Sequence, residues 1–483
     1  MSIDLRSWLE KVDAQGELAH VDGADWNLEI GTINTLHSRS ERCSALLFDG
    51  IKGYPKGHRV LTCSVNNLNR LAIAMNMPQG GSGMDFVKAM RAKLSVWEKT
   101  MHQFPPQEVA SGPVLQNVRS GKDVNLFELP VPKWHEADGG RYLGTGDAII
   151  TRDPESGAVN LGAYRVMVHD EKTTGLYMSP GKHGRIHCEK YHALGKPCPV
   201  AMSFGHHPLL HRAAATELPA GAEFGFIGAV LGEPVKVIRE EITGLPIPAD
   251  SEIVVVGWVP PDKTLSEGPF GEWTGYYASK ERQAPIVEVE RIYFRDNPII
   301  LGAPPDRAPF DASLASVVKD SAVLWDALDR SGVPDVRGVW ESEVGLQQFV
   351  VVSIKQRYPG HAKQAGMLAC QNRPPAYHGR YVIVVDEDID PSNITEVMWA
   401  LTTRSDPEKD IDIVRRAWST PLDTMIRKPT NAFFNSRAVI DACKPYEWID
   451  EFPQAISTSP EWEKKVRAKW GKTLDLKSRR KIW

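Results

Sequence analysis

The sequence predicts a mixed α/β fold of several domains, with a β-rich middle and an α/β region after it. Three observations lead to this prediction. The chain has 483 residues, which exceeds one ordinary domain of about 100–200 residues. Between about 114 and 302, short apolar or alternating runs are broken by glycine and proline, as in β-sheet domains. After 309, apolar runs of strand length alternate with helical patterns.

The first region combines short helices and strands. Leu5 to Val12 has the apolar spacing of a helix, and Val60 to Thr62 resembles a short strand. A proline-bearing loop, QFPPQEVASGPV, follows at 103–114 and supplies the first plausible boundary. We therefore assign 1–110 to an N-terminal α/β part of the fold.

The middle region, 111–305, is predicted to be a β-rich domain such as a barrel. Ile253 to Trp258 is a continuous apolar run, which is typical of a buried strand. Ile286 to Phe294 alternates valines with glutamates at its start, which is typical of a strand with one buried face.

The third region, 315–450, is predicted to be α/β. Phe349 to Ile354 and Tyr381 to Val385 read as strands. Asp390-Pro391 is expected to open the helix that follows the second strand. That helix has apolar residues at helical spacing: Ile394, Val397, Met398 and Leu401.

The remaining 451–483 form a tail whose last part, from Ser459, is basic. It carries tryptophans that we expect to be exposed, at Trp462, Trp470 and Trp483. The tail is either mobile or an arm that packs on another subunit.

Composition excludes several classes of protein. Lys and Arg number 57 against 61 Asp and Glu, so the formal charge of -4 provides no general attraction to nucleic acid or anionic lipid. The start of the chain mixes acids and bases and lacks a signal-peptide pattern. No apolar run approaches the roughly 20 residues that span a bilayer. The expected location is the cytoplasm, with no membrane or nucleic-acid partner. Reduced thiols are expected because no C-x-x-C pair occurs among the scattered cysteines, Cys43, Cys63, Cys188, Cys198, Cys370 and Cys443.

Several familiar motifs fail on inspection. Gly144 to Gly146 lacks the third glycine of a dinucleotide-binding loop, and Gly471 to Thr473 lacks the first glycine of a phosphate loop. His135-Glu136 is not followed by the second histidine of a zinc protease. Gly81 to Gly83 is not a nucleophile elbow, because methionine stands at the final glycine position. None of these chemistries is supported.

The pair His206-His207 lies between Gly205 and Pro208, in a predicted loop. Paired histidines can ligate a metal, but a structural or surface role is favoured for this pair.

Three stretches are dense in groups that can perform chemistry. The first is Asn160 to Asp170, continued by Ser179 to Gly184. The second is Leu218 to Glu223, continued by Gly228 to Pro234, and the third is Ser266 to Tyr276. The third stretch holds two glutamates, five residues apart around a Gly-Pro-Phe-Gly turn. Two such acids can face one cavity in different environments and thereby acquire different pKa values.

In order, these stretches resemble the UbiD family of reversible decarboxylases, over nearly the whole chain to about Pro445. The E-G-P-F-G-E segment at Glu267 to Glu272 is the most specific. The N-x-x-x-x-R segment at Asn160 to Arg165, T-T-R-x-D-P at Thr402 to Pro407 and P-L-D at Pro421 to Asp423 support it.

The resemblance implies a prenylated flavin mononucleotide whose phosphate is held through a divalent metal, Mn²⁺ or Mg²⁺, often with K⁺ alongside. The family's metal ligands fall on Asn160, His183 and Glu223, and this set of hard oxygens with one imidazole suits such metals. Glu233 is the alternative to Glu223. Arg437 is expected to contact the flavin phosphate. The implied cofactor-binding residues are Thr145, Asn160, Gly162, Ala163, Tyr164, Arg165, Met167, Lys182, His183, Glu223 and Arg437.

The family's catalytic residues fall on Arg165, Glu267 and Glu272. Arg165 is expected to fork onto the substrate carboxylate or onto Glu267. Glu272 is the candidate acid that delivers a proton to the carbon that loses carbon dioxide. The implied fold is a split β-barrel of flavin-reductase type followed by an α/β oligomerisation domain. The implied partners are a flavin prenyltransferase that supplies the cofactor and further copies of the chain, in a dimer or a hexamer.

Two other functions stay open: a flavin-binding oxidoreductase and a non-catalytic subunit of a carboxylase complex. The substrate is also open among aromatic, heteroaromatic and α,β-unsaturated acids, free or as coenzyme A thioesters, and so is the direction of the reaction. Lys182 either balances the flavin phosphate or recognises a second anionic or polar group on the substrate, with Arg307 assisting.

Overall fold

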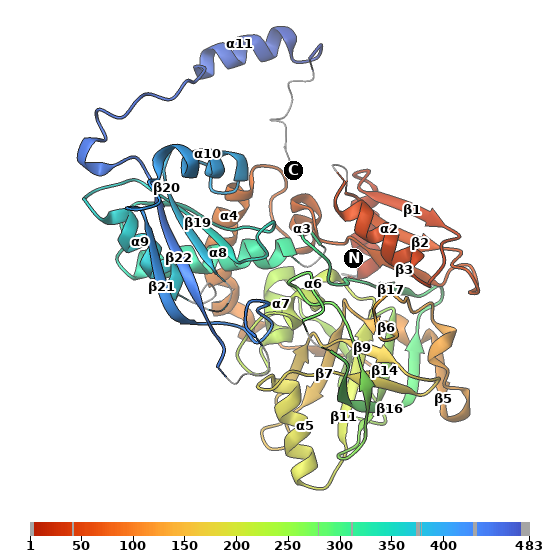
Figure 1. Ribbon diagram of the computed structural model, residues 1–483. Coiled ribbons are helices and arrows are strands. Elements are labelled where there is room, and N and C mark those ends of the chain that lie inside the picture. The colour runs from red at the N-terminus through yellow and green to blue at the C-terminus, as the bar shows by residue number, and fades with distance from the viewer. Residues whose placement is uncertain are drawn as a thin grey trace.

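The computed structural model describes residues 4–40, 43–278, 280–310, 313–372, 377, 379–427 and 432–474. Trp483, expected to be exposed, lies outside the described residues. Figure 1 shows an N-terminal layer, a β-rich middle and a C-terminal α/β domain, from red to blue along the chain. This confirms the predicted fold class. None of the helices within the described ranges is long and apolar enough to cross a membrane.

The N-terminal layer is a small sheet with helices packed on it. Its first helix begins at a capping box. The side chain of Asp4 accepts from the Ser7 N–H, and the side chain of Ser7 accepts from the Asp4 N–H. The strand order is β1-β2-β3-β17, so the last strand comes from far along the chain and runs parallel to β3. The elements are α1 (Leu5–Asp13), β1 (Leu18–Asp22), α2 (Glu29–Ser38), β2 (Ala45–Asp49), β3 (Arg59–Thr62), α3 (Leu68–Ala74), α4 (Gly83–Thr100) and β17 (Ile299–Leu301).

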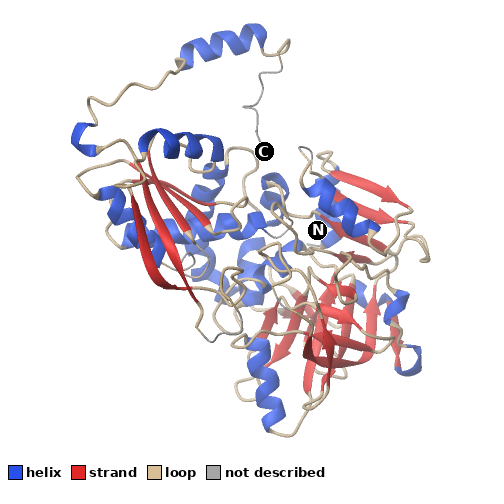
Figure 2. Cartoon of the chain, in the orientation of Figure 1, coloured by secondary structure: helices blue, strands red, loops and turns tan. Residues whose placement is uncertain are grey.

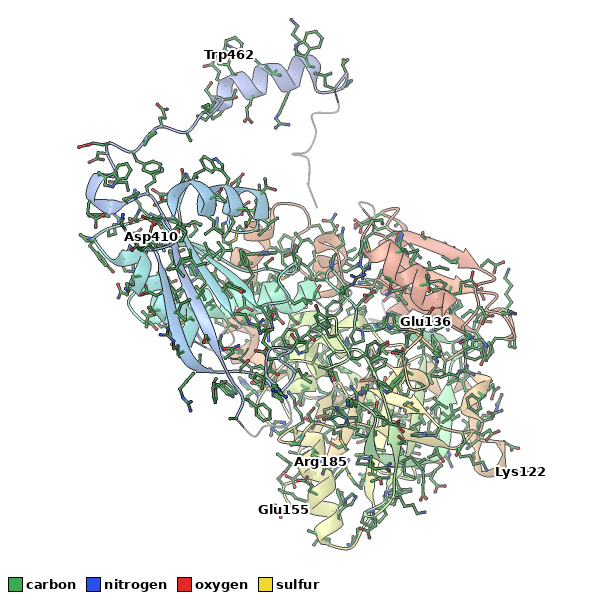
Figure 3. The ribbon with its side chains drawn as sticks, in the orientation of Figure 1. Lys122, Glu136, Glu155, Arg185, Asp410 and Trp462 are labelled. Atoms are coloured by element: carbon green, nitrogen blue, oxygen red, sulfur yellow. The ribbon has the colours of Figure 1, made fainter. Side chains whose placement is uncertain are left out.

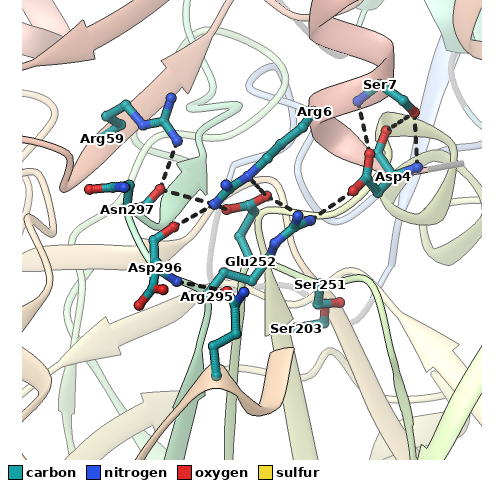
Figure 4. Close-up of polar contacts among 11 residues, drawn as sticks. Asp4, Arg6, Ser7, Arg59, Ser203, Ser251, Glu252, Arg295, Asp296 and Asn297 are labelled. Atoms are coloured by element: carbon teal, nitrogen blue, oxygen red, sulfur yellow. Dashed lines mark hydrogen bonds and ion pairs between the residues drawn. The ribbon is translucent and has the colours of Figure 1, made fainter. Parts of the chain in front are cut away.

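A buried ion cluster fastens α1 to the β-rich middle (Figure 4). Arg6 donates to both carboxylate oxygens of Glu252, at 2.9 and 2.8 Å, and Glu252 is fully buried. Arg295 bonds Asp4, the residue that caps α1, at 2.7 Å. Because loss of one partner would leave a buried charge unpaired, this cluster sets the position of the helix on the sheet.

The middle region is one antiparallel sheet that curls on itself (Figure 2). In the described chain the strand path is β6-β9-β10-β16-β14-β11-β7-β8, and β5 and β15 pair with β16. The predicted strands at Ile253 and Ile286 are β14 and β16, and they lie side by side. The strands are β5 (Asn117–Ser120), β6 (Arg141–Gly144), β7 (Ala148–Arg152), β8 (Val159–Gly162), β9 (Val166–Val168), β10 (Thr173–Leu176), β11 (Cys198–Phe204), β14 (Ile253–Val259), β15 (Thr264–Glu267) and β16 (Arg282–Phe294).

Three helices pack beside β8 and connect to a small three-stranded sheet. They are α5 (His183–Ala193), α6 (Pro208–Ala214) and α7 (Glu223–Leu231). The small sheet has the order β13-β12-β4, formed by β13 (Pro246–Pro248), β12 (Lys236–Arg239) and β4 (Gln107–Glu108).

His206 and His207 have structural positions. They are 1% and 6% exposed, so the surface role offered for this loop is wrong. His206 shares a hydrogen bond of 2.9 Å with the Ser203 hydroxyl, and the Nδ1 of His207 caps α6 by accepting from the Leu209 N–H. Burial holds the pKa of His207 at about 3, so this imidazole stays neutral and can accept that bond.

The C-terminal domain is α/β, as predicted. Its strand order is β18-β19-β20-β22-β21, with the three central strands parallel. The helix expected to open at Asp390-Pro391 begins later, at Ile394, because the side chain of Asn393 supplies the N-terminal cap. The elements are α8 (Ser313–Arg330), β18 (Val336–Glu341), β19 (Phe349–Ile354), α9 (His361–Gln371), β20 (Tyr381–Asp386), α10 (Ile394–Arg404), β21 (Ile411–Trp418) and β22 (Phe434–Ala442).

Helix α4 packs on both α7 and α8, and so joins the β-rich middle to the C-terminal domain. One hydrophobic cluster accordingly contains buried residues from all three regions, among them Leu5, Val87, Phe226 and Leu324. This shared core holds the regions together through burial of apolar surface.

The tail contains helix α11 (Pro460–Trp470), which stands away from the body of the protein (Figures 1 and 3). Trp462, Val466 and Trp470 recur every four residues and therefore lie along one face of the helix. They are 61%, 40% and 44% exposed, so the predicted exposure of both described tryptophans is confirmed.

Candidate active site

Arg165 is held by two glutamates that lie far from it in the sequence. Its Nε and Nη2 each donate to one carboxylate oxygen of Glu267 at 2.7 Å. Its Nη1 donates to Oε1 of Glu272 at 2.9 Å. Glu267 is fully buried, so the bidentate pair lies out of water, where such charge-assisted bonds are strongest. The structure thus brings together the three residues predicted to be catalytic.

The turn between the two glutamates explains how both reach Arg165. Glu267 is the last residue of β15, and Gly268 then adopts a φ of 88°, which favours glycine. The neighbouring loop fits closely, since a Cβ on Gly139 would lie 2.0 Å from the carbonyl oxygen of Gly268. After the turn, the Glu272 N–H donates to the Tyr276 carbonyl at 3.0 Å, which fixes the second glutamate.

Tyr142 is a site residue that the sequence did not reveal. Its hydroxyl donates to Oε1 of Glu267 at 3.0 Å, and its ring stacks on Phe270, with 3.9 Å between ring centroids. Burial, together with the charge of Glu267, raises the pKa of Tyr142, so the phenol stays protonated and remains a donor. No local pattern marks this tyrosine, because it meets Glu267 only through the folding of β6 beside the 268–270 turn.

Glu272 has a different environment from Glu267. Burial raises the pKa of its carboxyl group, and the positive charges of Arg165 and Arg282 oppose that effect without cancelling it. The raised pKa of Glu272 makes this carboxyl group suited to hold a proton.

Tyr177 separates this network from a second arginine. Its ring centroid lies 4.7 Å from the guanidinium carbon of Arg165 and 4.3 Å from that of Arg282. The Tyr177 N–H donates to the Arg165 carbonyl at 3.3 Å, which holds Tyr177 beside Arg165. Sequence reasoning also missed Arg282, although the pairing of β15 with β16 across a hairpin could have indicated it.

Two of the three predicted metal ligands, Asn160 and Glu223, interact with Tyr164, and the third, His183, adjoins Gly184, which bonds that tyrosine. Asn160 lies on β8, while His183 and Glu223 are the first residues of α5 and α7, both of which pack beside that strand. The Tyr164 hydroxyl accepts from the Gly184 N–H at 3.2 Å, next to His183. Burial raises the pKa of Tyr164, while the Gly184 N–H and the side chain of Asn160 lower it.

The glycines around Tyr164 make room for it. A Cβ on Gly162 would lie 2.2 Å from the Tyr164 ring, and one on Gly184 would lie 2.7 Å from it. Any larger residue at either position would push the ring away and disturb the neighbouring β8 and α5.

Glu223 has the features of a metal ligand. It is 2% exposed, and its Oε2 has no hydrogen-bond partner within the described residues. Burial raises the pKa of its carboxyl group to about 7, although hydrogen bonds from the backbone N–H groups of Glu223 and Leu161 lower it. A buried carboxylate oxygen without a partner is costly unless a cation or a donor binds it. An amide, an imidazole and a carboxylate form a donor set that fits Mn²⁺ or Mg²⁺.

Protein side chains alone do not complete such a centre. Within the described part of the chain, no three His, Cys, Asp or Glu side chains cluster as a metal site would require. Since the set includes an asparagine and only two such residues, water molecules or a bound anion such as a phosphate would supply the further oxygens.

Glu233, the alternative ligand, lies beyond the other end of α7. It follows Gly232, which ends the helix in the left-handed conformation, and it is exposed. The nine residues of α7 rise by about 13 Å, which separates Glu233 from Glu223.

The other predicted cofactor residues occupy several places. Thr145 follows β6, and its Oγ1 accepts from the Ala303 N–H at 2.9 Å. Met167 is buried on β9, two residues after Arg165, and the Ala163 N–H donates to the Ala214 carbonyl at 3.1 Å. Lys182 is exposed and precedes α5 as its cap residue.

Arg437 lies in the C-terminal domain, on β22. Its guanidinium is buried and donates to the carbonyl oxygens of Gly379 and Trp418. Burial lowers its pKa. The structure thus places Arg437 within the C-terminal sheet rather than among the residues around Tyr164.

Comparison with known proteins shows to which family the chain is similar. Models of the 3-octaprenyl-4-hydroxybenzoate carboxy-lyase match at 9–90 (N-terminal domain), 107–308 (Rift-related domain) and 314–442 (C-terminal domain). The chain is 34% identical over 429 residues to the pyrrole-2-carboxylic acid decarboxylase of Pseudomonas aeruginosa, covering 85% of this chain and 84% of that protein.

Two solved structures have the same fold. The UbiD-class enzyme HmfF from Pelotomaculum thermopropionicum, in complex with FMN, matches with a TM-score of 0.85 and 28% identity over 97% of this chain and 100% of that one. The open form of vanillic acid decarboxylase from Sedimentibacter hydroxybenzoicus matches with a TM-score of 0.83 and 30% identity, over 97% and 99% of the two chains. Fold and matches together define a carboxy-lyase. The chain belongs to the UbiD family, as its motifs predicted.

Proposed function

We propose that this protein is a non-oxidative decarboxylase of an aromatic, heteroaromatic or α,β-unsaturated carboxylic acid and that it uses prenylated FMN. The observation that carries the proposal is the network in which Arg165 binds Glu267 and Glu272 at 2.7 to 2.9 Å. Hydride transfer by a flavin oxidoreductase does not need an arginine flanked by two acids. A non-catalytic subunit would not need these residues either.

The proposed roles follow from the environments of the three residues. Arg165 is held in place by Glu267. It positions the substrate carboxylate through the N–H groups that do not bond Glu267 or Glu272. Burial raises the pKa of Glu272 and so favours its protonated form, which delivers its proton to the carbon from which carbon dioxide leaves. Tyr142 keeps Glu267 oriented toward Arg165.

Asn160, His183 and Glu223 would hold Mn²⁺ or Mg²⁺, and the metal would hold the flavin phosphate, with K⁺ alongside. Thr145, Met167 and Lys182 would contact the flavin, and a flavin prenyltransferase would supply it. When bound, the prenylated flavin supplies an electron sink for the electrons released with carbon dioxide. The structure of HmfF in complex with FMN supports a flavin cofactor for this chain.

The chain is also proposed to form a homo-oligomer, a dimer or a hexamer, in the cytoplasm. The exposed Trp462, Val466 and Trp470 of α11 support this, because an apolar stripe on a helix of this length is ordinarily buried against a partner.

One experiment tests the function. The protein is produced with and without a flavin prenyltransferase, the bound flavin is characterised by absorption spectrum and mass, and carbon dioxide release is measured on a panel of acids. We expect prenylated FMN and carbon dioxide release only after co-production with the prenyltransferase. Full activity with plain FMN, or hydride-transfer activity without decarboxylation, would overturn the proposal.

A further inference from the structure

Arg282 lies opposite Glu267 in the active-site sheet. The two residues are register partners in the antiparallel pair of β15 and β16. Directly opposed residues in such a pair present their side chains on the same face of the sheet. Arg282 therefore points to the face on which Glu267 meets Arg165, although no sequence motif includes it.

Arg282 nevertheless makes no ion pair with Glu267. Throughout the described ranges, its guanidinium has no hydrogen bond or salt bridge, and its contact is with the ring of Tyr177, at 4.3 Å. Arg165 lies 4.7 Å from the same ring and is bound by two carboxylates. The Tyr177 ring thus contacts two arginines: Arg165, whose charge is neutralised by carboxylates, and Arg282, whose charge is not.

The charges on this face leave Arg282 without a match. Arg165 and Arg282 are opposed by Glu267 and Glu272, so the group is balanced when both glutamates are ionised. When Glu272 holds the proton that it is proposed to deliver, one positive charge remains in excess. A guanidinium that is half-buried and unpaired is ready to bind a planar anion with two hydrogen bonds.

We propose that Arg282, supported by Tyr177, recognises a second anionic group on the substrate, such as a ring carboxylate other than the one that is lost. This inference rests on the proposed decarboxylase function and adds the substrate class: aromatic or heteroaromatic acids with a further carboxylate or comparably anionic substituent. The other two cations considered for this role, Lys182 and Arg307, are both exposed. Neither is a register partner of Glu267 on the same face of the sheet, as Arg282 is.

The test compares Arg282→Gln and Arg282→Lys with the unaltered protein. Arg185→Gln is the matched control, because Arg185 is a surface arginine of α5 that pairs with Glu189 (Figure 3). The probes are pyrrole-2-carboxylate and pyrrole-2,5-dicarboxylate. Binding is measured by calorimetry on protein loaded with plain FMN, so that no turnover is needed, and carbon dioxide release is measured on protein loaded with the prenylated flavin. Flavin content and melting temperature verify folding.

We expect the unaltered protein to bind the dicarboxylate more tightly than the monocarboxylate. Arg282→Gln should weaken dicarboxylate binding about ten- to a hundredfold, which is the range for loss of a charge-assisted pair, and leave monocarboxylate binding nearly unchanged. Arg282→Lys should recover part of the loss, and Arg185→Gln should match the unaltered protein.

Three results would overturn the inference: no preference for the dicarboxylate in the unaltered protein, equal losses on both acids, or no loss on either. Equal losses of affinity for both acids would show that Arg282 binds the carboxylate that leaves as carbon dioxide. If the binding preference depends on Arg282 but no acid releases carbon dioxide, the proposed decarboxylation fails while the anion site stands.

Discussion

Arg165 donates two hydrogen bonds of 2.7 Å to Glu267 but only one, of 2.9 Å, to Glu272. The two contacts are unequal in kind: the Glu267 pair is bidentate and fully buried at its carboxylate, while the Glu272 pair uses one oxygen. Glu267 is thereby held as a counter-charge through both of its oxygens, whereas one carboxylate oxygen of Glu272 makes no bond to Arg165. The two glutamates should consequently respond differently to substitution.

Glu272→Gln should leave the fold and the flavin in place and reduce turnover by about two to four orders of magnitude, the range for loss of a general acid. Glu267→Gln should in addition lower stability, because removing one partner of a buried ion pair costs about 3–5 kcal/mol. Turnover and denaturant unfolding would be measured on both variants. If Glu272→Gln retains most of its activity while Glu267→Gln loses it, the roles are reversed.

Activity should decline on the alkaline side as Glu272 loses its proton. Because burial raises its pKa, this decline should come at a higher pH than for an ordinary carboxyl group. Arg282 lowers that pKa, so Arg282→Gln should move the decline to still higher pH. The pH dependence of kcat would be measured for both Arg282→Gln and Arg185→Gln. In Arg185→Gln the alkaline decline should come at the same pH as in the unaltered protein. A shift to lower pH in Arg282→Gln would contradict this reading.

Glu223→Gln should reduce bound Mn²⁺, measured by metal analysis and equilibrium binding, and should reduce flavin retention with it. Gln keeps an oxygen but loses the negative charge that a hard cation prefers. Glu233→Gln is the matched control, since Glu233 lies beyond the far end of α7. Loss of metal in the control, with retention in Glu223→Gln, would assign the ligand to Glu233 instead.

Lys182→Gln should lower flavin content without distinguishing between acids. Lys182 is the cap residue at the N-terminus of α5, directly before His183, and a positive charge at such a site favours a bound phosphate. Flavin content and Michaelis constants for a monoacid and a diacid would be measured together. A selective loss on the diacid with full flavin content would return the substrate-recognition role to Lys182.

Replacing Trp462 and Trp470 together by Ser should reduce the oligomer mass measured by light scattering. Both residues lie on the exposed apolar face of α11, and burying that face on another copy would stabilise the assembly. Lys464→Gln, on a different face of the helix, should leave the mass unchanged. An unaltered mass in the double variant would show that the arm does not hold the oligomer together.

The sequence by itself determined the fold class, most of the strands and the identity of the three catalytic candidates. Apolar runs such as Ile253 to Trp258 predict strands because the hydrophobic pattern of a buried strand is formed by residues that are close in sequence. The start of the helix at Ile394 was predicted too early, because Asn393 rather than Asp390 caps it, and capping depends on side-chain geometry. The family motifs identified Arg165, Glu267 and Glu272 without any account of how they meet.

Only the tertiary structure decided which residues surround them. Tyr142 reaches Glu267 across 125 positions of the chain, and Arg282 shares a face with Glu267 because β15 and β16 pair in one register. It likewise separated Glu223 from Glu233, by putting one at each end of α7. Contacts of this kind follow from strand pairing and helix packing over long sequence separations, which local patterns of hydrophobicity do not encode.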